Sequence, residues 1–120
     1  MINERVRNKL IEIAKKQGKY EKGVITYSEL NIDCNLGINF EGDAGGKEIG
    51  KILGDISEYE LDNERPPLSV LVGLKYKKPF TPSDGFFNLM DKLKIREYKE
   101  TNDQLKIRLM NWCYNYWAKH

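Results

Sequence analysis

The sequence predicts a mainly helical α+β fold, and three observations support this class. Apolar residues recur at three- and four-residue steps in several stretches, which is the period of an amphipathic α-helix. Two short runs, 24–27 and 68–76, are rich in β-branched residues and are typical of strands. The chain has 120 residues, the length of one domain, so we expect residues 1–120 to share a single core.

The composition excludes some classes of protein. The 20 basic and 18 acidic residues give a formal net charge of +2, which by itself does not indicate a nucleic-acid partner. No apolar run approaches the roughly 20 residues of a membrane span, and residues 1–5 lack the apolar region of a signal peptide. Cys34 and Cys113 are far apart, and His120 is the single histidine. We therefore expect a cytoplasmic protein that binds no membrane, no metal ion and no cofactor.

The first third of the chain predicts two helices separated by a strand. Apolar residues at helical spacing predict a first helix over residues 2–17. A β-prone run then predicts a strand at 24–27. Ser28 belongs to the residue types that cap helices, so a short helix is expected over 28–31. Residues 31–43 are rich in Asn, Asp and Gly, and they indicate an ordered loop.

The longest helix is predicted over residues 44–62. Its apolar stripe consists of Ile49, Ile52, Leu53, Ile56 and Tyr59. Pro66 disfavours a helical conformation at Arg65, so the helix has to end before that residue. The run 68–76 is apolar and β-branched enough for a central strand.

Two further helices are predicted, over residues 86–94 and 102–118. Thr101 and Gln104 have the spacing of a capping box, which fixes the start of the last helix. Aromatic residues on that helix follow helical spacing and are therefore assigned to the core. We expect Trp112 to be largely buried.

Glycines form a second stripe on the 44–62 helix, at Gly46, Gly50 and Gly54. An interior glycine destabilises a helix by roughly 1 kcal/mol relative to alanine. This loss indicates that another group approaches the helix backbone closely. That group is either a neighbouring element of the fold or a ligand such as a phosphate backbone, and internal packing is the preferred interpretation.

Acidic residues gather near the end of the same helix. Asp55, Glu58 and Asp62 share one face by their spacing. We interpret them as a solvated face with Arg65 as a partner, in preference to a site for a cation or a basic protein.

Two segments carry a resemblance to a known family. Residues 26–31 read Thr-Tyr-Ser-Glu-Leu-Asn, and residues 46–50 read Gly-Lys-Glu-Ile-Gly. They resemble the Thr-Tyr-Gly-Glu-Leu-Ala turn and the Ala-Arg-Ala-Val-Gly recognition helix of the O6-alkylguanine-DNA alkyltransferase and alkyltransferase-like family, with Lys47 in the arginine's position. A proline-rich break and a buried strand follow in both, so the resemblance covers roughly residues 23–74. It implies a winged-helix-like core that binds DNA.

The chain departs from this family at the catalytic motif. The family's Pro-Cys-His-Arg, or its tryptophan variant, corresponds to residues 68–74, which here read Leu-Ser-Val-Leu-Val-Gly-Leu. Because the nucleophilic cysteine is missing, the resemblance implies DNA binding without alkyl transfer. Residues 65–72 and 82–87 are also similar to segments of small bacterial proteins, and that similarity implies no function.

The first functional hypothesis is a non-enzymatic DNA-binding domain of the alkyltransferase-like type. Lysines at the start of the 44–62 helix would approach phosphates, where the helix dipole also favours anions. Glycines would allow close approach of the backbone, and the tyrosine would contact the DNA as the matching family residue does. Lysines after the second strand would contact further phosphates. The candidate residues are Tyr27, Gly46, Lys47, Gly50, Lys51, Lys75, Lys77 and Lys78.

The alternative is a module that binds a nucleotide-like small molecule or a protein. The same helix start would hold a phosphate or carboxylate, and the loop at 82–87 would complete a pocket. The acidic face suits this hypothesis better, because it would repel DNA. The candidate residues are Tyr27, Gly45, Gly46, Arg65, Ser69, Gly85 and Phe86.

An enzyme is the third hypothesis. Glu58 or Glu60, near Arg65 and Tyr59, could perform acid–base chemistry. Carboxylates on a helix are more often a solvated face, and the sequence has no phosphate-binding loop and no nucleophile–histidine pattern. We therefore do not expect an enzyme.

Overall fold

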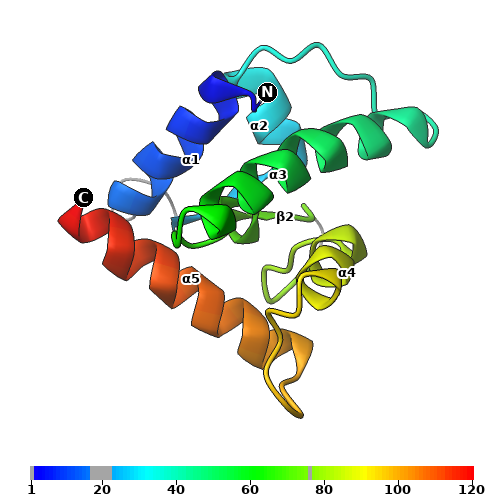
Figure 1. Cartoon of the computed structure of the whole chain (residues 1–120). Coiled ribbons are helices and arrows are strands. Elements are labelled where there is room, and N and C mark those ends of the chain that lie inside the picture. Colours follow the sequence, from blue (N-terminus) through cyan, green and yellow to red (C-terminus); the bar gives the residue numbers. More distant parts are fainter. Residues whose placement is uncertain (1, 17–22, 76) are drawn as a thin grey trace.

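A computed structural model describes residues 2–16, 23–75 and 77–120 of the chain (Figure 1). The elements in order are α1 (Glu4–Lys15), β1 (Ile25–Thr26), α2 (Tyr27–Asp33), α3 (Ala44–Asp62), the 3-10 helix η2 (Leu68–Leu71), β2 (Val72–Gly73), α4 (Asp84–Lys92) and α5 (Asn102–Lys119). The predicted class, α+β and mainly helical, is confirmed. Within the described ranges, no helix is long and apolar enough to cross a membrane.

The two strands form a small parallel sheet. Ile25 lies opposite Val72, and Thr26 lies opposite Gly73. The sheet brings the start of α2 beside the segment that follows β2, although about 45 residues separate them in the sequence, because parallel strands need a long crossover connection.

The predicted strand at 68–76 is wrong over its first four residues, which form η2. These residues are buried, as a central strand would be, but their backbone hydrogen bonds go elsewhere. The Ser69 amide donates to the Ser57 hydroxyl of α3 at 3.1 Å, and the Val70 amide donates to the Pro67 carbonyl at 3.2 Å. The predicted end of this strand, at Tyr76, lies outside the described residues.

The strand predicted at 24–27 is also shorter than expected, because a capping box begins α2 early. Thr26 Oγ1 accepts from the Glu29 amide at 3.2 Å, and Glu29 Oε1 accepts from the Thr26 amide at 3.0 Å. Tyr27 is therefore helical, Ser28 is not the cap, and the helix runs to Asp33 instead of residue 31.

The other helices match their predictions to within two residues. The bounds of α3 are as predicted. Asn3 caps α1 by accepting from the Val6 amide at 3.0 Å, so the helix starts at Glu4; the predicted last residue, Gln17, lies outside the described ranges. Helix α4 starts two residues early, after Ser83, and the predicted capping box of α5 is confirmed.

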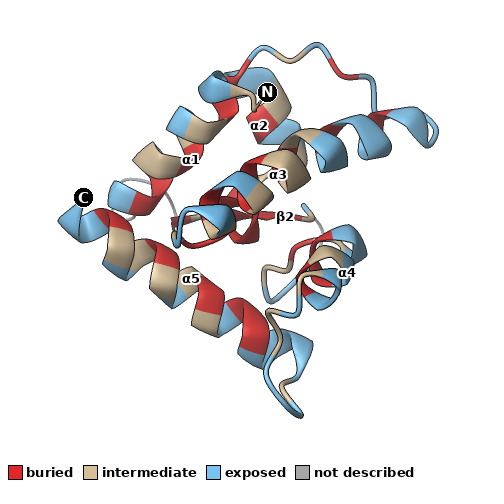
Figure 2. Ribbon diagram, in the orientation of Figure 1, coloured by how far each residue is buried: buried red, intermediate tan, exposed pale blue. Residues whose placement is uncertain are grey.

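The core lies where α1, α5, η2 and the C-terminal half of α3 meet, whereas the N-terminal turns of α3 are exposed (Figure 2). Trp112, expected to be largely buried, is half-buried, and Trp117 is the buried tryptophan of α5. The fully buried side chains include Val6, Leu10, Ile13, Leu30, Ile56, Leu68, Leu71, Met90, Leu105 and Leu109.

A buried ion-pair group joins three segments of this core. Glu60, near the end of α3, is fully buried. Arg7 of α1 donates to its two oxygens at 3.0 and 3.2 Å, and Arg65 donates to them at 3.0 and 3.1 Å. Both guanidinium groups also lie within 6 Å of the centre of the Tyr59 ring, at 5.6 and 5.2 Å. The hydrogen bond from Arg65 to Glu60 raises the pKa of Arg65, so this guanidinium group stays charged.

A second set of ion pairs and hydrogen bonds stabilises the connection between α4 and α5. Arg108 donates to the carboxylate of Glu100 at 2.7 and 2.9 Å, and these bonds lower the pKa of Glu100 to about 2. Arg96 donates to Asp91 of α4 and to Asn102 of α5, at 2.6 Å in each case. The end of α4 is therefore held against the start of α5.

Candidate functional site

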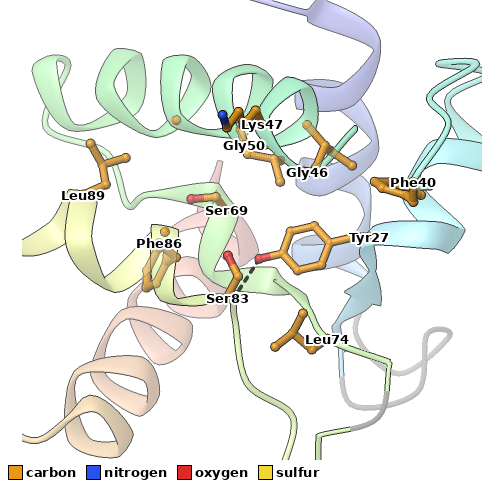
Figure 3. Close-up of a pocket in the computed structure, with 14 residues that line it drawn as sticks. Tyr27, Phe40, Gly46, Lys47, Gly50, Ser69, Leu74, Ser83, Phe86 and Leu89 are labelled. Carbon is orange, nitrogen blue, oxygen red and sulfur yellow. Dashed lines mark hydrogen bonds between the residues drawn. The ribbon is translucent and has the colours of Figure 1, made fainter. Parts of the chain in front are cut away.

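A pocket of about 580 Å³ lies between α3 and α4 (Figure 3). We call it the glycine pocket, because Gly46, Gly50 and Gly54 line its α3 side. Tyr27, at the start of α2, and Leu74, after β2, also line it. The remaining lining residues are Phe40, Lys47, Ile49, Leu53, Ser69, Ser83, Gly85, Phe86 and Leu89.

The glycine stripe is not explained by internal packing. A methyl group added at Gly46 or Gly50 would meet no described atom within 4 Å, and one at Gly54 would lie 3.7 Å from Leu89, an ordinary contact. The preferred interpretation from the sequence is therefore wrong for Gly46 and Gly50. Neither residue has a positive φ, so backbone conformation does not require glycine there. What their missing side chains provide is open space beside α3.

At Gly45 and Gly73, in contrast, neighbouring parts of the chain leave no space for a side chain. A methyl group on Gly45 would collide with the backbone carbonyl of Asn39, so this residue allows the loop before α3 to pack against the helix. A methyl group on Gly73 would lie 2.5 Å from the Phe80 ring and 2.8 Å from the Thr81 carbonyl oxygen. Close approach of other parts of the chain requires both glycines.

The loop between β2 and α4 is held in place from two sides. The Leu74 amide donates to the Thr81 carbonyl at 3.0 Å, next to the sheet. Lys106 of α5 is only 5% exposed, and its ammonium group donates a hydrogen bond to the Phe80 carbonyl oxygen at 2.7 Å. These contacts place Ser83 and the first turn of α4 at the edge of the glycine pocket.

Three hydroxyl groups face the glycine pocket, as Figure 3 shows for Tyr27, Ser69 and Ser83. The Tyr27 oxygen accepts from the Ser83 amide at 3.0 Å. Ser69 is 4% exposed, and its hydroxyl forms a 2.5 Å hydrogen bond with the hydroxyl of Ser57. Apart from Lys47, the described residues that line the pocket carry no charged side chain.

A second, more open hollow of about 500 Å³ lies on the other side of Tyr27 and Leu74. We call it the lysine hollow, because Lys75 and Lys77 line it together with Thr26, Tyr27, Ser28 and Leu74. Tyr27 thus separates an apolar pocket from a basic hollow.

The structure places the DNA candidates on both sides of Tyr27. Gly46, Lys47 and Gly50 line the glycine pocket, and Lys75 and Lys77 line the lysine hollow. The other two lysines line neither. Lys51 forms an ion pair with Asp55 at 3.1 Å, and Lys78 is exposed on the loop after β2.

Five of the seven candidates for the ligand-binding alternative, Tyr27, Gly46, Ser69, Gly85 and Phe86, line the glycine pocket. The two that do not are Gly45, which packs against the loop, and Arg65, which is held by Glu60. Arg65 was expected to pair with the acidic face of α3, but its partner is the buried Glu60.

Sequence reasoning missed Phe40, Leu89 and Lys106 as residues of the site. Leu89 of α4 is partly buried against the core, and it also lines the pocket. Phe40 lies in the irregular loop before α3 and is 37% exposed, a feature that no periodic pattern could show. Ser83 belongs to the loop 82–87 that the ligand-binding alternative placed at a pocket, and it lines the glycine pocket.

The cysteines and carboxylates provide no reactive centre next to the pocket. Burial raises the pKa of Cys34 and of Cys113, so both thiols stay protonated, and neither lines the pocket. Glu60, one of the two residues considered for acid–base chemistry, has both oxygens occupied by Arg7 and Arg65. Among the described residues, no group of three or more His, Cys, Asp or Glu side chains could hold a metal ion.

Comparisons of the chain with protein-family models, with curated proteins and with solved structures found no match.

Two glycine substitutions test whether the glycine pocket is open. Gly50→Ala should raise the free energy of unfolding by roughly 1 kcal/mol, since alanine is the better helix former and its methyl group meets nothing. Gly73→Ala should lower it by about 1–3 kcal/mol, because the methyl group overlaps Phe80 and Thr81. Urea unfolding followed by circular dichroism measures both. A loss of stability in Gly50→Ala would mean that another group does pack against this face of α3.

Proposed function

We propose that this protein is a non-enzymatic module that binds a small, largely apolar molecule in the glycine pocket. The observation that carries the proposal is the open glycine face of α3. Gly50, in the interior of α3, destabilises the helix by roughly 1 kcal/mol relative to alanine, and no described atom packs where a side chain at Gly46 or Gly50 would lie. The two glycines instead leave room for an occupant that would touch the helix backbone.

The size and lining of the pocket support this proposal. Its volume of about 580 Å³ lies within the range of small-molecule sites, roughly 300–1,000 Å³. The walls are mostly apolar, with Ile49, Leu53, Phe86 and Leu89 among them, and a few hydroxyl groups provide polar contacts. Burial of an apolar ligand against such walls is favourable by about 25 cal/mol per Å² of apolar surface.

The lining also supports binding without catalysis. Of the described residues that face the pocket, none is a histidine, cysteine, aspartate or glutamate. The hydroxyl groups of Ser69 and Ser83 therefore have no general base beside them in the pocket wall, and such a base is what activates a serine nucleophile.

Binding of an uncharged fluorescent dye tests the proposal. The fluorescence of N-phenyl-1-naphthylamine rises when the dye moves from water into apolar surroundings. Titration of the protein into this dye should produce a saturable rise. The rise should be lost in Gly50→Leu, because the added side chain extends into the pocket. Circular dichroism checks that the variant is folded.

The control for this titration is Asn88→Leu. Asn88 is an exposed residue of α4 that does not line the pocket, so the variant adds the same side chain elsewhere on the surface. It should bind the dye as the unmodified protein does. Absence of a saturable rise in the unmodified protein, or an equal rise in Gly50→Leu, would contradict the proposal.

DNA binding is the second candidate function, and the lysine hollow is the observation that favours it. Lys75 and Lys77 flank Tyr27 on one side, Lys47 lies on the other, and Lys78 follows on the same loop. A row of cations around an aromatic side chain suits a phosphate backbone with a base or sugar against the ring. The resemblance to the alkyltransferase-like family supports the same candidate.

Fluorescence anisotropy of labelled duplex and single-stranded DNA, at two salt concentrations, tests this candidate. Binding should weaken as salt increases. Lys47→Ala, Lys77→Ala and Lys78→Ala should each reduce the salt slope by about one unit for the phosphate contact removed. Lys119→Ala, at the end of α5, is the control and should change nothing. No binding at tens of micromolar protein in low salt would exclude DNA as the partner.

A further inference from the structure

The hydroxyl groups of the glycine pocket indicate which chemical class of molecule it accepts. This inference rests on the proposed function, because it concerns the occupant of the same pocket. Its starting point is the pair of buried serines, Ser57 of α3 and Ser69 of η2, whose oxygens are 2.5 Å apart.

The position of the hydrogen atoms in this pair follows from the surroundings. Ser57 is fully buried, does not line the pocket, and its oxygen already accepts from the Ser69 amide at 3.1 Å. Within the described part of the chain, the Ser69 oxygen is the single acceptor that its hydroxyl hydrogen reaches. Either oxygen could be the donor of this bond, and because buried hydroxyl groups are nearly always hydrogen-bonded, we assign Ser57 as the donor and Ser69 as the acceptor. The hydroxyl hydrogen of Ser69 is then left over, and Ser69 is the member of the pair that lines the pocket.

Tyr27 has the same arrangement. Its oxygen accepts from the Ser83 amide at 3.0 Å, and its own hydrogen has no acceptor among the described residues. Figure 3 shows both side chains below α3, with the Tyr27 hydroxyl group directed toward Ser83. The hydroxyl oxygens of Tyr27 and Ser69 therefore each accept one hydrogen bond, whereas their hydroxyl hydrogens have no acceptor among the described residues. The pocket presents two donors in an otherwise apolar lining.

We infer that the glycine pocket selects an uncharged apolar molecule that carries a carbonyl oxygen, such as an aryl ketone, an ester or an amide. A carbonyl oxygen has two lone pairs and no hydrogen, so it can accept from the Ser69 or the Tyr27 hydroxyl group, both of which line the pocket. A carboxylate would also accept, but Lys47 is the one cation in the described lining, and a charge that is buried without a partner is costly. Lys47 is exposed on the outer turns of α3.

Two probes of nearly the same shape test this inference. In isopropylbenzene, a CH–CH₃ group replaces the C=O group of acetophenone. Their affinities are measured by displacement of N-phenyl-1-naphthylamine from the protein. Ser69→Ala and Tyr27→Phe should each weaken the binding of acetophenone by about three- to tenfold, which corresponds to one net hydrogen bond. Neither variant should weaken the binding of isopropylbenzene, since the hydrocarbon uses no donor.

Each variant also removes one internal hydrogen bond, with Ser57 in Ser69→Ala and with the Ser83 amide in Tyr27→Phe, so the hydrocarbon probe shows whether the pocket itself is altered. Equal losses for the two probes in both variants, or no loss for either probe, would overturn the inference and leave the proposed function standing. If neither probe displaces the dye from the unmodified protein, the inference is overturned. If the dye itself shows no saturable binding, the proposed function fails with it.

Discussion

The carboxylate of Glu60 is the constraint on which the rest of the structure depends. It is fully buried, and four N–H donors from Arg7 and Arg65 surround it. Removing one partner from a buried ion pair typically destabilises a protein by about 3–5 kcal/mol, so the three residues have to stay together. They join α1, the end of α3 and the turn that leads to η2. That turn sends η2 back against α3, which puts Ser69 against Ser57 and beside the glycine pocket.

The N-terminal half of α3 contrasts with this anchored end. Its last turns are fixed by Glu60 and by apolar side chains such as Ile56, whereas Gly46 and Gly50 lie exposed with no described atom where a side chain would be. Leucine or alanine at these positions would make a more stable helix. Proteins often keep such locally unfavourable residues where a partner has to come close, and Tyr27 and Ser69 bring hydroxyl groups to the same pocket.

The sequence predicts the helices well because their signals are local. The bounds of α3 follow from an apolar stripe and from Pro66, and the start of α5 follows from the Thr101–Gln104 capping box. The short strands are predicted less well, because the composition of an apolar run such as 68–71 suits a strand and a buried 3-10 helix equally. The hydrogen bond from the Ser69 amide to Ser57 decides between them, and it joins residues twelve positions apart. The sequence indicates many residues of the site by their type, such as the glycines of α3. It does not show which of them lie next to one another, because the pocket walls come from segments far apart in the chain. The role of Lys106 depends on a contact with Phe80 that no periodicity reveals.

Intermolecular nuclear Overhauser effects between bound N-phenyl-1-naphthylamine and methyl-labelled protein would test the central claim most directly, namely that an apolar molecule occupies the open side of α3. The account predicts effects to the methyl groups of Ile49, Leu53 and Leu89, which line the glycine pocket. Ile32 and Ile107 are the controls, since they are 76% and 55% exposed and do not line the pocket. Effects confined to those two exposed residues, or no effect to any of the three pocket residues, would contradict it.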